Sequence, residues 1–338
     1  MPPLSSSAPA VPLPPWPAGD ERGMGNTQGP ATWWRAAVHL SAPGAKCYEL
    51  AHAVTNTIPQ SPMCNPLKFS PRPTRGIRGS YHVSNMETLT GDQGGQSTHI
   101  DALGHFGVSP VKWDGSSELP MEEVTYYGGY TQAQVKPEPS SMLQHLGIDK
   151  APPIITSAVL LDAKAHMGKG RTLEPGTVIT AADIEQMLIA QGLAERGILP
   201  GDVLYIHTGW GADHWGKPVE DNVYYTMGPG LGCDAARYIA DRAVVLVALD
   251  NPFTDAVNSG QLAGKASSAN GYPDGLPFAI HHHCLVEAGI HQIQNAKLDE
   301  LAKDQVWQSC TFVLPLRIQG AVGSMVRPVA IGVPGQGK

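Results

Sequence analysis

Residues 94–106 hold the side chains of this chain that are best suited to chemistry. They include two imidazoles, His99 and His105, one carboxylate, Asp101, and two small hydroxyls, set between glycines that let backbone approach a ligand closely. His99 and Asp101 are two residues apart, so on an extended segment their side chains leave the same face. A short helical turn after Asp101 would fold His105 back over the same place.

Imidazole and carboxylate ligands at this spacing suit Zn²⁺ or Mn²⁺, and a further imidazole nearby suits a general base. The alternative is a polar loop whose His and Asp side chains only satisfy backbone groups. Two histidines and one aspartate within seven residues, among glycines, favour the metal site.

Residues 97–105 resemble the metal-binding motif of the Putative cyclase superfamily, written His-x-Gly-Thr-His-x-Asp-Ala-x-x-His. This superfamily of metal-dependent hydrolases includes kynurenine formamidase, isatin hydrolase and trans-dienelactone hydrolase. The chain departs at the first ligand, because Gly95 stands where the family usually has His, with Gln96 beside it. Longer members often carry a Gln there too. The resemblance implies that His99 and Asp101 are catalytic metal ligands.

A tract of three histidines, residues 281–283, opens a predicted helix. Consecutive helical residues point in different directions, so at most one or two of them can face a shared site. A solvated surface tract is the other interpretation. Family members have a His at the start of this helix and, beyond a Gly-Ile pair, a Glu that binds metal; here Gln294 stands at the Glu position. Counting back from Gln294 selects His282 under the formamidase spacing and His281 under the spacing of longer members.

Further similarities in order extend the resemblance from about residue 47 to 331. It implies an α/β fold of the swivelling β/β/α type, with a mixed sheet core and flanking helices. Because one His and one Glu ligand are replaced, and Gln is neutral and a poor Zn²⁺ ligand, we expect one divalent metal ion per subunit, Zn or Mn. The predicted ligands are His99, Asp101, Gln96, His281 or His282, and Gln294. His105 is then the general base rather than a ligand.

The composition is that of a globular protein: 338 residues, 42% hydrophobic and 16% charged, with a net charge of −7. The mild acidity predicts no nucleic-acid partner, and the chain has neither a polybasic run nor an apolar run of the ~18 residues that span a bilayer. Five scattered cysteines without CxxC spacing argue against a disulfide scaffold. They fit a reducing compartment, so we expect a cytoplasmic protein.

The Pro- and Ser-rich residues 1–25 predict a disordered or extended arm, laid against a neighbouring subunit of a homodimer or homotetramer. Residues 26–338 form one predicted domain. Alternating runs at 47–54 and 81–89 predict strands, the second leading into the motif. Apolar runs at 158–162, 203–210 and 243–251 predict buried strands. Residues 180–192 predict a helix with Thr180 as its N-cap, Asp183 at the capping-box position and Gly192 at its end.

Ligands gather beyond strand ends, which makes Thr208, Trp210, Asp250 and Asn251 candidates for the outer wall of the site. Strand-end turn chemistry is the competing interpretation for each of them. Residues 107–153 are interpreted as loops that shape a mouth over the site. Their aromatic residues, with Trp210, predict a substrate that contains a ring. The predicted substrate-binding residues are Trp113, Tyr127, Trp210 and Thr98.

Three classes of function compete at this point. The first is a metal-dependent hydrolase of cyclic or aryl amides, imides or lactones. The second is a degenerate binding protein that kept the fold and lost the metal. The third is a metal-dependent lyase or dehydratase that uses His105 as a base. Because His99, Asp101 and His105 are retained, the hydrolase is the favoured prediction.

Overall fold

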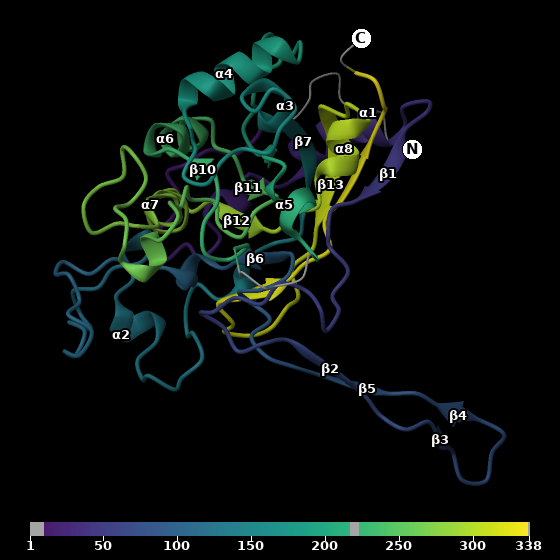
Figure 1. The fold of residues 1–338 in the computed structure, drawn as a ribbon, viewed down its shortest axis with the longest axis vertical. Coiled ribbons are helices and arrows are strands. Elements are labelled where there is room, and N and C mark those ends of the chain that lie inside the picture. Colours follow the sequence, from purple (N-terminus) through teal and green to yellow (C-terminus); the bar gives the residue numbers. More distant parts are fainter. Residues whose placement is uncertain (1–9, 217–222, 337–338) are drawn as a thin grey trace.

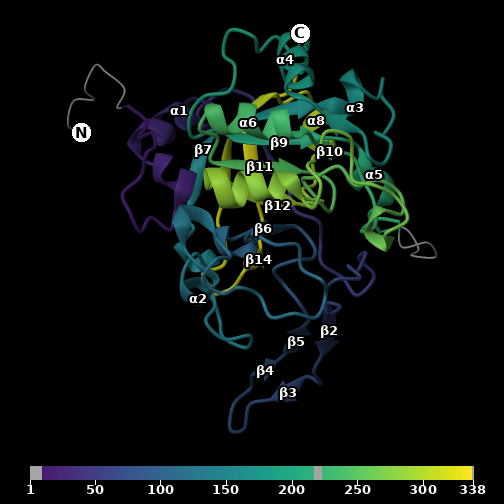
Figure 2. The ribbon, with the colours of Figure 1, turned by 90° about the vertical axis from the view of Figure 1, so that its left-hand side faces the viewer.

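The computed structural model describes residues 10–216 and 223–336. Its centre is a nine-stranded mixed sheet with the strand order β1-β15-β13-β7-β9-β11-β12-β6-β14 (Figures 1 and 2). The strands of this sheet are β1 (Lys46–Glu49), β6 (His99–Asp101), β7 (Ile154–Asp162), β9 (Val203–His207), β11 (Leu246–Leu249), β12 (His291–Gln294), β13 (Gln308–Val313), β14 (Gly323–Met325) and β15 (Val329–Gly332). The expected α/β fold with a mixed sheet core is confirmed.

The four central strands β7, β9, β11 and β12 run parallel, and nearly all of their residues are buried. Continuous apolar runs are what a strand covered on both faces requires, which explains why β7, β9 and β11 were predictable. β12, with the sequence His-Gln-Ile-Gln, has no such run and was not predicted. The motif strand β6 pairs antiparallel with β12 and with β14. Its register sets Gln294 opposite His99, although 195 positions separate them in the chain.

Helices cover this sheet. They are α1 (Pro30–Leu40), α2 (Gln132–Val135), α3 (Ala163–His166), α4 (Ala181–Ala190), α5 (Trp210–His214), α6 (Cys233–Asp241), α7 (Ala279–His281) and α8 (Asp299–Lys303). A π-helix, His282–Ala288, continues α7. Helix α1 packs on β7 and β13, whereas α4 packs on α6 and α6 packs on the π-helix. The capping box of Thr180 and Asp183 at the start of α4 is present, as predicted.

Three two-stranded pairs complete the strands. One is β8 (Val178–Ile179) with β10 (Gly230–Leu231), and the other two together form a long hairpin. The hairpin consists of β2 (Lys68–Pro71), β3 (Arg75–Gly76), β4 (Val83–Ser84) and β5 (Glu87–Thr90). It projects away from the rest of the molecule (Figures 1 and 2). The alternating run at 81–89 therefore belongs to an exposed hairpin and not to a core strand, because period-two alternation is the same in either setting.

Part of the segment before α1 packs on its own chain. Met24 is 5% exposed and belongs to the main core, and its backbone N–H donates to the Gly289 carbonyl at 2.8 Å. Trp16 packs against the same core. Residues 1–9 of the predicted arm lie outside the described residues. Among the described residues, no helix is long and apolar enough to cross a membrane.

A buried ion cluster joins α1 to the sheet. The Asp202 carboxylate, fully buried just before β9, accepts hydrogen bonds from Arg35 Nη2 of α1 at 2.9 Å and from Arg196. Ser157 Oγ and the Leu199 N–H also donate to it, at 2.6 and 2.9 Å. Because every partner of this carboxylate is polar and fixed, the cluster sets how α1 lies on the sheet.

Removing the charge of Asp202 should leave two partly buried guanidinium groups without their buried anion. We expect Asp202→Asn to lower the free energy of unfolding by about 3–5 kcal/mol, as for other broken buried ion pairs. Urea titration followed by circular dichroism measures this loss. Asp274→Asn, which removes an exposed ion pair with Lys112, is the control and should leave the midpoint unchanged. A midpoint for Asp202→Asn equal to that of the control would contradict the structural role.

Candidate active site

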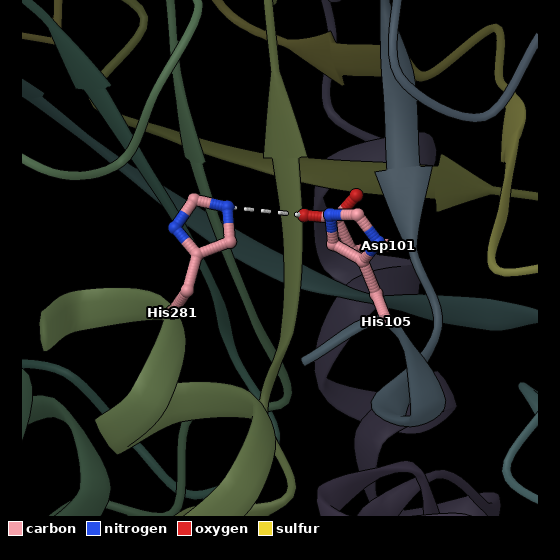
Figure 3. Close-up of side chains that lie close together, drawn as sticks. All are labelled: Asp101, His105 and His281. Carbon is pink, nitrogen blue, oxygen red and sulfur yellow. Dashed lines mark ion pairs between the residues drawn. The ribbon is translucent and has the colours of Figure 1, made fainter. Parts of the chain in front are cut away.

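The motif residues lie on β6 and on the 3₁₀ turn that follows it. β6 is extended, so His99 and Asp101 point to one face, and both line a cavity. The turn Leu103–His105 then folds His105 back to the same cavity, as the spacing predicted. His281 reaches it from the end of α7 (Figure 3). The structure therefore places His281, and not His282, in the site.

Asp101, His105 and His281 offer ligand atoms that all lie within 4.8 Å of one another. Nε2 of His281 is 3.6 Å from Asp101 Oδ2, and Nε2 of His99 is 3.8 Å from Asp101 Oδ1. One carboxylate thus stands among three imidazoles. This donor set and its spacing fit a divalent transition-metal ion.

Hydrogen bonds behind two of the imidazoles orient them toward the cavity. Nδ1 of His281 lies 2.5 Å from Asp255 Oδ2, and Nδ1 of His99 lies 2.9 Å from the Ser97 carbonyl. Both acceptors require Nδ1 to carry the proton, which leaves the lone pair on Nε2 as the ligand atom. The amide nitrogen of Gln294 lies 3.4 Å from Nε2 of His281. Burial lowers the pKa of His99. Burial alone would also lower the pKa of His281, but the Asp255 and Asp101 carboxylates raise it above its ordinary value.

The backbone conformation at Ser97 helps to orient His99. Ser97 has a φ of 57°, a left-handed conformation that is uncommon for a residue with a side chain, and it occupies the glycine position of the family motif. Its carbonyl accepts from His99 Nδ1 and from Asn295 Nδ2, the latter at 2.6 Å. The strained turn thus presents an acceptor to both residues.

Gln294 lies against Asp101 in the buried wall of the cavity. Its Nε2 donates to Asp101 Oδ2 at 2.8 Å. The other atom of each group, Asp101 Oδ1 and Gln294 Oε1, is buried and has no hydrogen-bond partner among the described residues. A buried carboxylate oxygen without a partner is costly. Both orphaned atoms are explained if a cation binds there, so the residues present fit a metal ion.

The cavity has a volume of about 220 Å³ and opens between polar and apolar walls. Its apolar wall is rich in aromatic rings, contributed by segments far apart in the chain: Phe106, Tyr225, Phe253 and Phe278. Met63, Cys64 and Pro252 add to it. The predicted aromatic wall exists, but none of the residues predicted for it is part of it.

The four predicted substrate-binding residues have other roles. Trp113 is 62% exposed and donates to the Ser117 carbonyl, away from the cavity. Tyr127 is buried and donates to Asp20 at 3.1 Å, and Trp210 is buried in a cluster with Tyr224 and Tyr225. Thr98 Oγ1 donates to the Asn295 carbonyl at 2.6 Å. The structure does not bring these four residues into the cavity, because aromatic composition does not reveal which loop faces it.

Residues 107–153 contribute none of the described residues that line the cavity, so they do not form its mouth. The strand-end candidates serve turn chemistry instead. Asp250 accepts from the Thr208 N–H and Oγ1 at 2.8 and 2.7 Å, and Asn251 donates to the Pro229 carbonyl. The contacts of these residues are those that the competing interpretation, strand-end turn chemistry, expects.

Two predicted metal ligands also have other partners. Gln96 is fully buried, its Oε1 accepts from the Ser61 N–H at 3.2 Å, and its Nε2 donates to the Asn65 carbonyl at 2.7 Å. Its amide is thereby saturated and not directed at the cavity. His282 lies outside the cavity, where its Nε2 is 3.2 Å from Glu287 Oε1. His283 pairs with the same carboxylate.

Sequence reasoning missed Asp255, the carboxylate behind His281. It follows a buried strand by several residues in a segment without periodicity, so only its proximity in space reveals it. The ring residues of the cavity were missed for the same reason. Phe106, directly after the motif, is the exception that its position could have indicated.

The model of the Putative cyclase family matches residues 48–256, well over half of the chain. This chain belongs to the Putative cyclase family. Among solved structures, a protein described as a novel cyclase is similar at 25% sequence identity and a TM-score of 0.74, covering 93% of this chain and 95% of that chain. Comparison with proteins of curated function finds no match.

Two isatin hydrolases share the fold of this family member at lower similarity. One, bound to the product analogue thioisatinate, has 18% identity and a TM-score of 0.55 over 88% of this chain and 96% of that chain. The other, isatin hydrolase A from Ralstonia solanacearum, has 18% identity and a TM-score of 0.53 over 87% of this chain and 95% of that chain.

Replacing His281 should remove metal, whereas replacing its neighbour should not. We expect His281→Ala to lower bound Zn²⁺ or Mn²⁺ at least tenfold, because the variant loses an imidazole that Asp255 orients. His282→Ala is the matched control and should keep the stoichiometry of the natural chain. Inductively coupled plasma mass spectrometry on protein purified without a His tag gives the answer. Equal metal loss in both variants would contradict the placement.

Restoring the residues usual in the family should raise the metal content from about one ion per chain towards two. Gly95 faces the cavity, where an added Cβ would meet only Cys64 Sγ, at 3.0 Å. Gln294→Glu replaces the N–H that occupies Asp101 Oδ2 with an anion, so both oxygens of Asp101 would be available to hold metal ions. We expect Gly95→His with Gln294→Glu to bind close to two ions in the same measurement. Two tightly bound ions in the natural chain would refute the premise.

Proposed function

We propose that this chain is a metal-dependent hydrolase that opens a cyclic or aryl amide, imide or lactone with an activated water. The observation that carries the proposal is the buried, unpartnered Oδ1 of Asp101, which faces a cavity together with the imidazoles of His99, His105 and His281. Membership of the cyclase family and the fold shared with isatin hydrolases support a hydrolase-like enzyme.

The residues that would hold the ion are Asp101, His99 and His281, with Gln294 Oε1 as a neutral fourth donor. When bound, a divalent ion polarises a carbonyl and lowers the pKa of water toward ~7. The Gln294 N–H on Asp101 Oδ2 leaves that carboxylate one free oxygen, which supports one ion per subunit.

His105 is the proposed general base. It is half-buried at the cavity wall, and burial lowers the pKa of His105, so its ring is neutral near pH 7. A neutral imidazole can take a proton from the attacking water and then give it to the leaving nitrogen or oxygen. Its ring packs edge-on against Phe106 at a centroid distance of 5.0 Å, which holds it at the wall.

The aromatic wall supports a substrate that contains a ring. Phe106 and Phe278 pack edge-to-face at 6.0 Å between centroids, and Phe253 lies 5.6 Å from Phe278. Rings arranged in this way bind flat apolar surfaces, while the polar end of the cavity receives a carbonyl group. The volume of about 220 Å³ suits a small molecule with one or two rings.

The proposal is tested by the mass of the product. Tag-free protein loaded with Zn²⁺ or Mn²⁺ is incubated with a panel of cyclic amides, imides, lactones and aryl formamides, followed by mass spectrometry. Hydrolysis adds one water to the substrate, and a chelator should abolish it. A product that has lost water would instead identify a lyase or dehydratase. Turnover of no member of the panel, with no bound metal, would favour a binding protein.

Removing the general base should slow turnover without removing the ion. We expect His105→Ala to lower kcat by about 10²–10⁴-fold, the usual contribution of general acid–base catalysis, and to leave metal content near one ion per chain. His282→Ala, outside the cavity, is the control and should keep full activity. Because His105 is also within ligand distance of Asp101 and His281, loss of metal in His105→Ala would make it a ligand instead.

A further inference from the structure

One buried polar group in the wall of the cavity neither holds the ion nor moves a proton in the proposed hydrolysis. It is the hydroxyl of Tyr225, a side chain that is 1% exposed and lines the cavity together with His99 and Asp101. A tyrosine hydroxyl has an oxygen that accepts hydrogen bonds and a proton that it can donate. When buried, it usually finds a partner within the protein, because an unpaired polar group is costly away from water. The contacts of Tyr225 therefore decide what it can offer to a bound molecule.

The oxygen of the Tyr225 hydroxyl is an acceptor in this structure. Asn295 Nδ2 lies 3.2 Å from it. The other contacts of the Asn295 amide fix its orientation: Nδ2 also lies 2.6 Å from the Ser97 carbonyl, which can only accept, and Oδ1 accepts from the Tyr224 hydroxyl at 2.9 Å. The Asn295 amide therefore donates to Tyr225, and the contact cannot take up the proton of Tyr225.

That proton is left without an acceptor among residues 10–216 and 223–336. Burial raises the pKa of Tyr225, whereas hydrogen bonds from the Ser97 backbone and the Asn295 amide lower it in part. A hydrogen bond lowers the pKa of a phenol when the oxygen accepts it, so both contacts occupy the oxygen. The net shift is upward, so the hydroxyl keeps its proton at neutral pH. Because the side chain lines the cavity, an acceptor bound there can receive this proton.

Two strained residues hold the donor at the end of the cavity where His99 lies. Ser97 and Asn295 have φ angles of 57° and 58°, a left-handed conformation that is uncommon for residues with a side chain. The Ser97 carbonyl accepts from His99 Nδ1 and from Asn295 Nδ2, and the same Nδ2 reaches Tyr225. One carbonyl thus positions a metal-ligating imidazole and, through Asn295, the Tyr225 hydroxyl. Strain of this kind is concentrated at functional sites.

A substrate of the proposed class supplies the acceptor. The carbonyl oxygen of an amide, imide or lactone accepts hydrogen bonds, and it gains negative charge when water attacks the carbonyl carbon. The ring of Tyr225 packs edge-on against Tyr224 at a centroid distance of 5.1 Å, so the hydroxyl is held in place before a substrate binds. A donor fixed in advance binds the charged oxygen more strongly than the neutral carbonyl and lowers the barrier.

We propose that Tyr225 is a catalytic residue whose hydroxyl donates a hydrogen bond to the carbonyl oxygen of the substrate; this inference rests on the hydrolysis proposed above. As the oxygen of water bonds to the carbonyl carbon, His105 takes one proton of the water and the π electrons of the carbonyl move onto its oxygen, where the Tyr225 hydroxyl stabilises them. When the carbonyl reforms, the bond to the leaving nitrogen or oxygen breaks and His105 returns the proton to that atom. Tyr225 keeps its own proton throughout.

Tyr225→Phe removes the hydroxyl and keeps the ring. On the panel member that the natural chain hydrolyses fastest, we expect kcat to fall by about 10²–10³-fold, the usual loss on removing one such donor, with KM and metal content nearly unchanged. Tyr205→Phe is the matched control. Tyr205 is fully buried, shares a hydrogen bond with Thr311 Oγ1 at 2.7 Å and does not line the cavity, so this variant should keep full activity. An unchanged kcat in Tyr225→Phe overturns the proposal, as does loss of the metal, which would mean that Tyr225 acts by orienting His99.

A second measurement does not depend on turnover. Acetophenone labelled with ¹³C at its carbonyl carries a ring and a carbonyl group and cannot be hydrolysed. Infrared difference spectroscopy of the bound ketone should place its carbonyl band at lower wavenumber in the natural chain and in Tyr205→Phe than in Tyr225→Phe, because a hydrogen bond weakens the C=O bond. Equal bands in all three proteins, or a ketone that does not bind the natural chain, would contradict the donor.

The two measurements separate this inference from the hydrolase proposal. A natural chain that hydrolyses no member of the panel, yet shows the band shift, retains the Tyr225 donor and refutes the hydrolase alone. A natural chain that hydrolyses its substrate, with kcat and band both unchanged in Tyr225→Phe, refutes the donor alone.

Discussion

The antiparallel pairing of β6 with β12 is the constraint on which the site depends. Its register sets Gln294 opposite His99 and brings the amide of Gln294 onto the Asp101 carboxylate. Asp101 is 1% exposed, so its charge has to be matched from within the protein. One oxygen receives the Gln294 N–H and the other receives nothing from the described residues. The site is thus organised around a carboxylate of which only one oxygen has a hydrogen-bond partner among the described residues.

The change from Glu to Gln at position 294 alters the charge of that wall. A glutamate would place two carboxylates side by side, an arrangement that requires more than one positive charge to offset it. With Gln294 the wall holds a single carboxylate, and the amide both donates to it and offers Oε1 to the cavity. This difference is the basis for the proposal of a single ion, while the histidines around it are retained.

The π-helix explains how one histidine tract serves two surfaces. His281 ends α7 and points to the cavity, while His282 and His283 follow on the wider turn and pair with Glu287. Glu287 belongs to the same turn, so the pairing satisfies two rings that would otherwise be free. Such turns recur at functional sites because they shift the direction of successive side chains.

The features that could be predicted from the sequence depend on residue spacing within short segments. The two-residue step from His99 to Asp101, the continuous apolar strands and the Thr180–Asp183 capping box each specify their own structure over a few residues. These features also carry the family resemblance. They were sufficient to predict the fold, and they include the motif residues that line the cavity.

Contacts between residues far apart in the chain depend on how the elements pack, which the sequence patterns did not reveal. The helical turns at 279–288 direct the side chain of His281, and not that of His282, into the cavity. The fold places the Asp255 carboxylate behind His281. The same packing places Gln96 away from the cavity, where its amide donates to the carbonyls of Asn65 and Asp92. Aromatic rings from four separate segments became the cavity wall. The alternating run at 81–89 lies in an exposed hairpin. Period-two alternation indicates a strand but does not reveal whether other elements cover it.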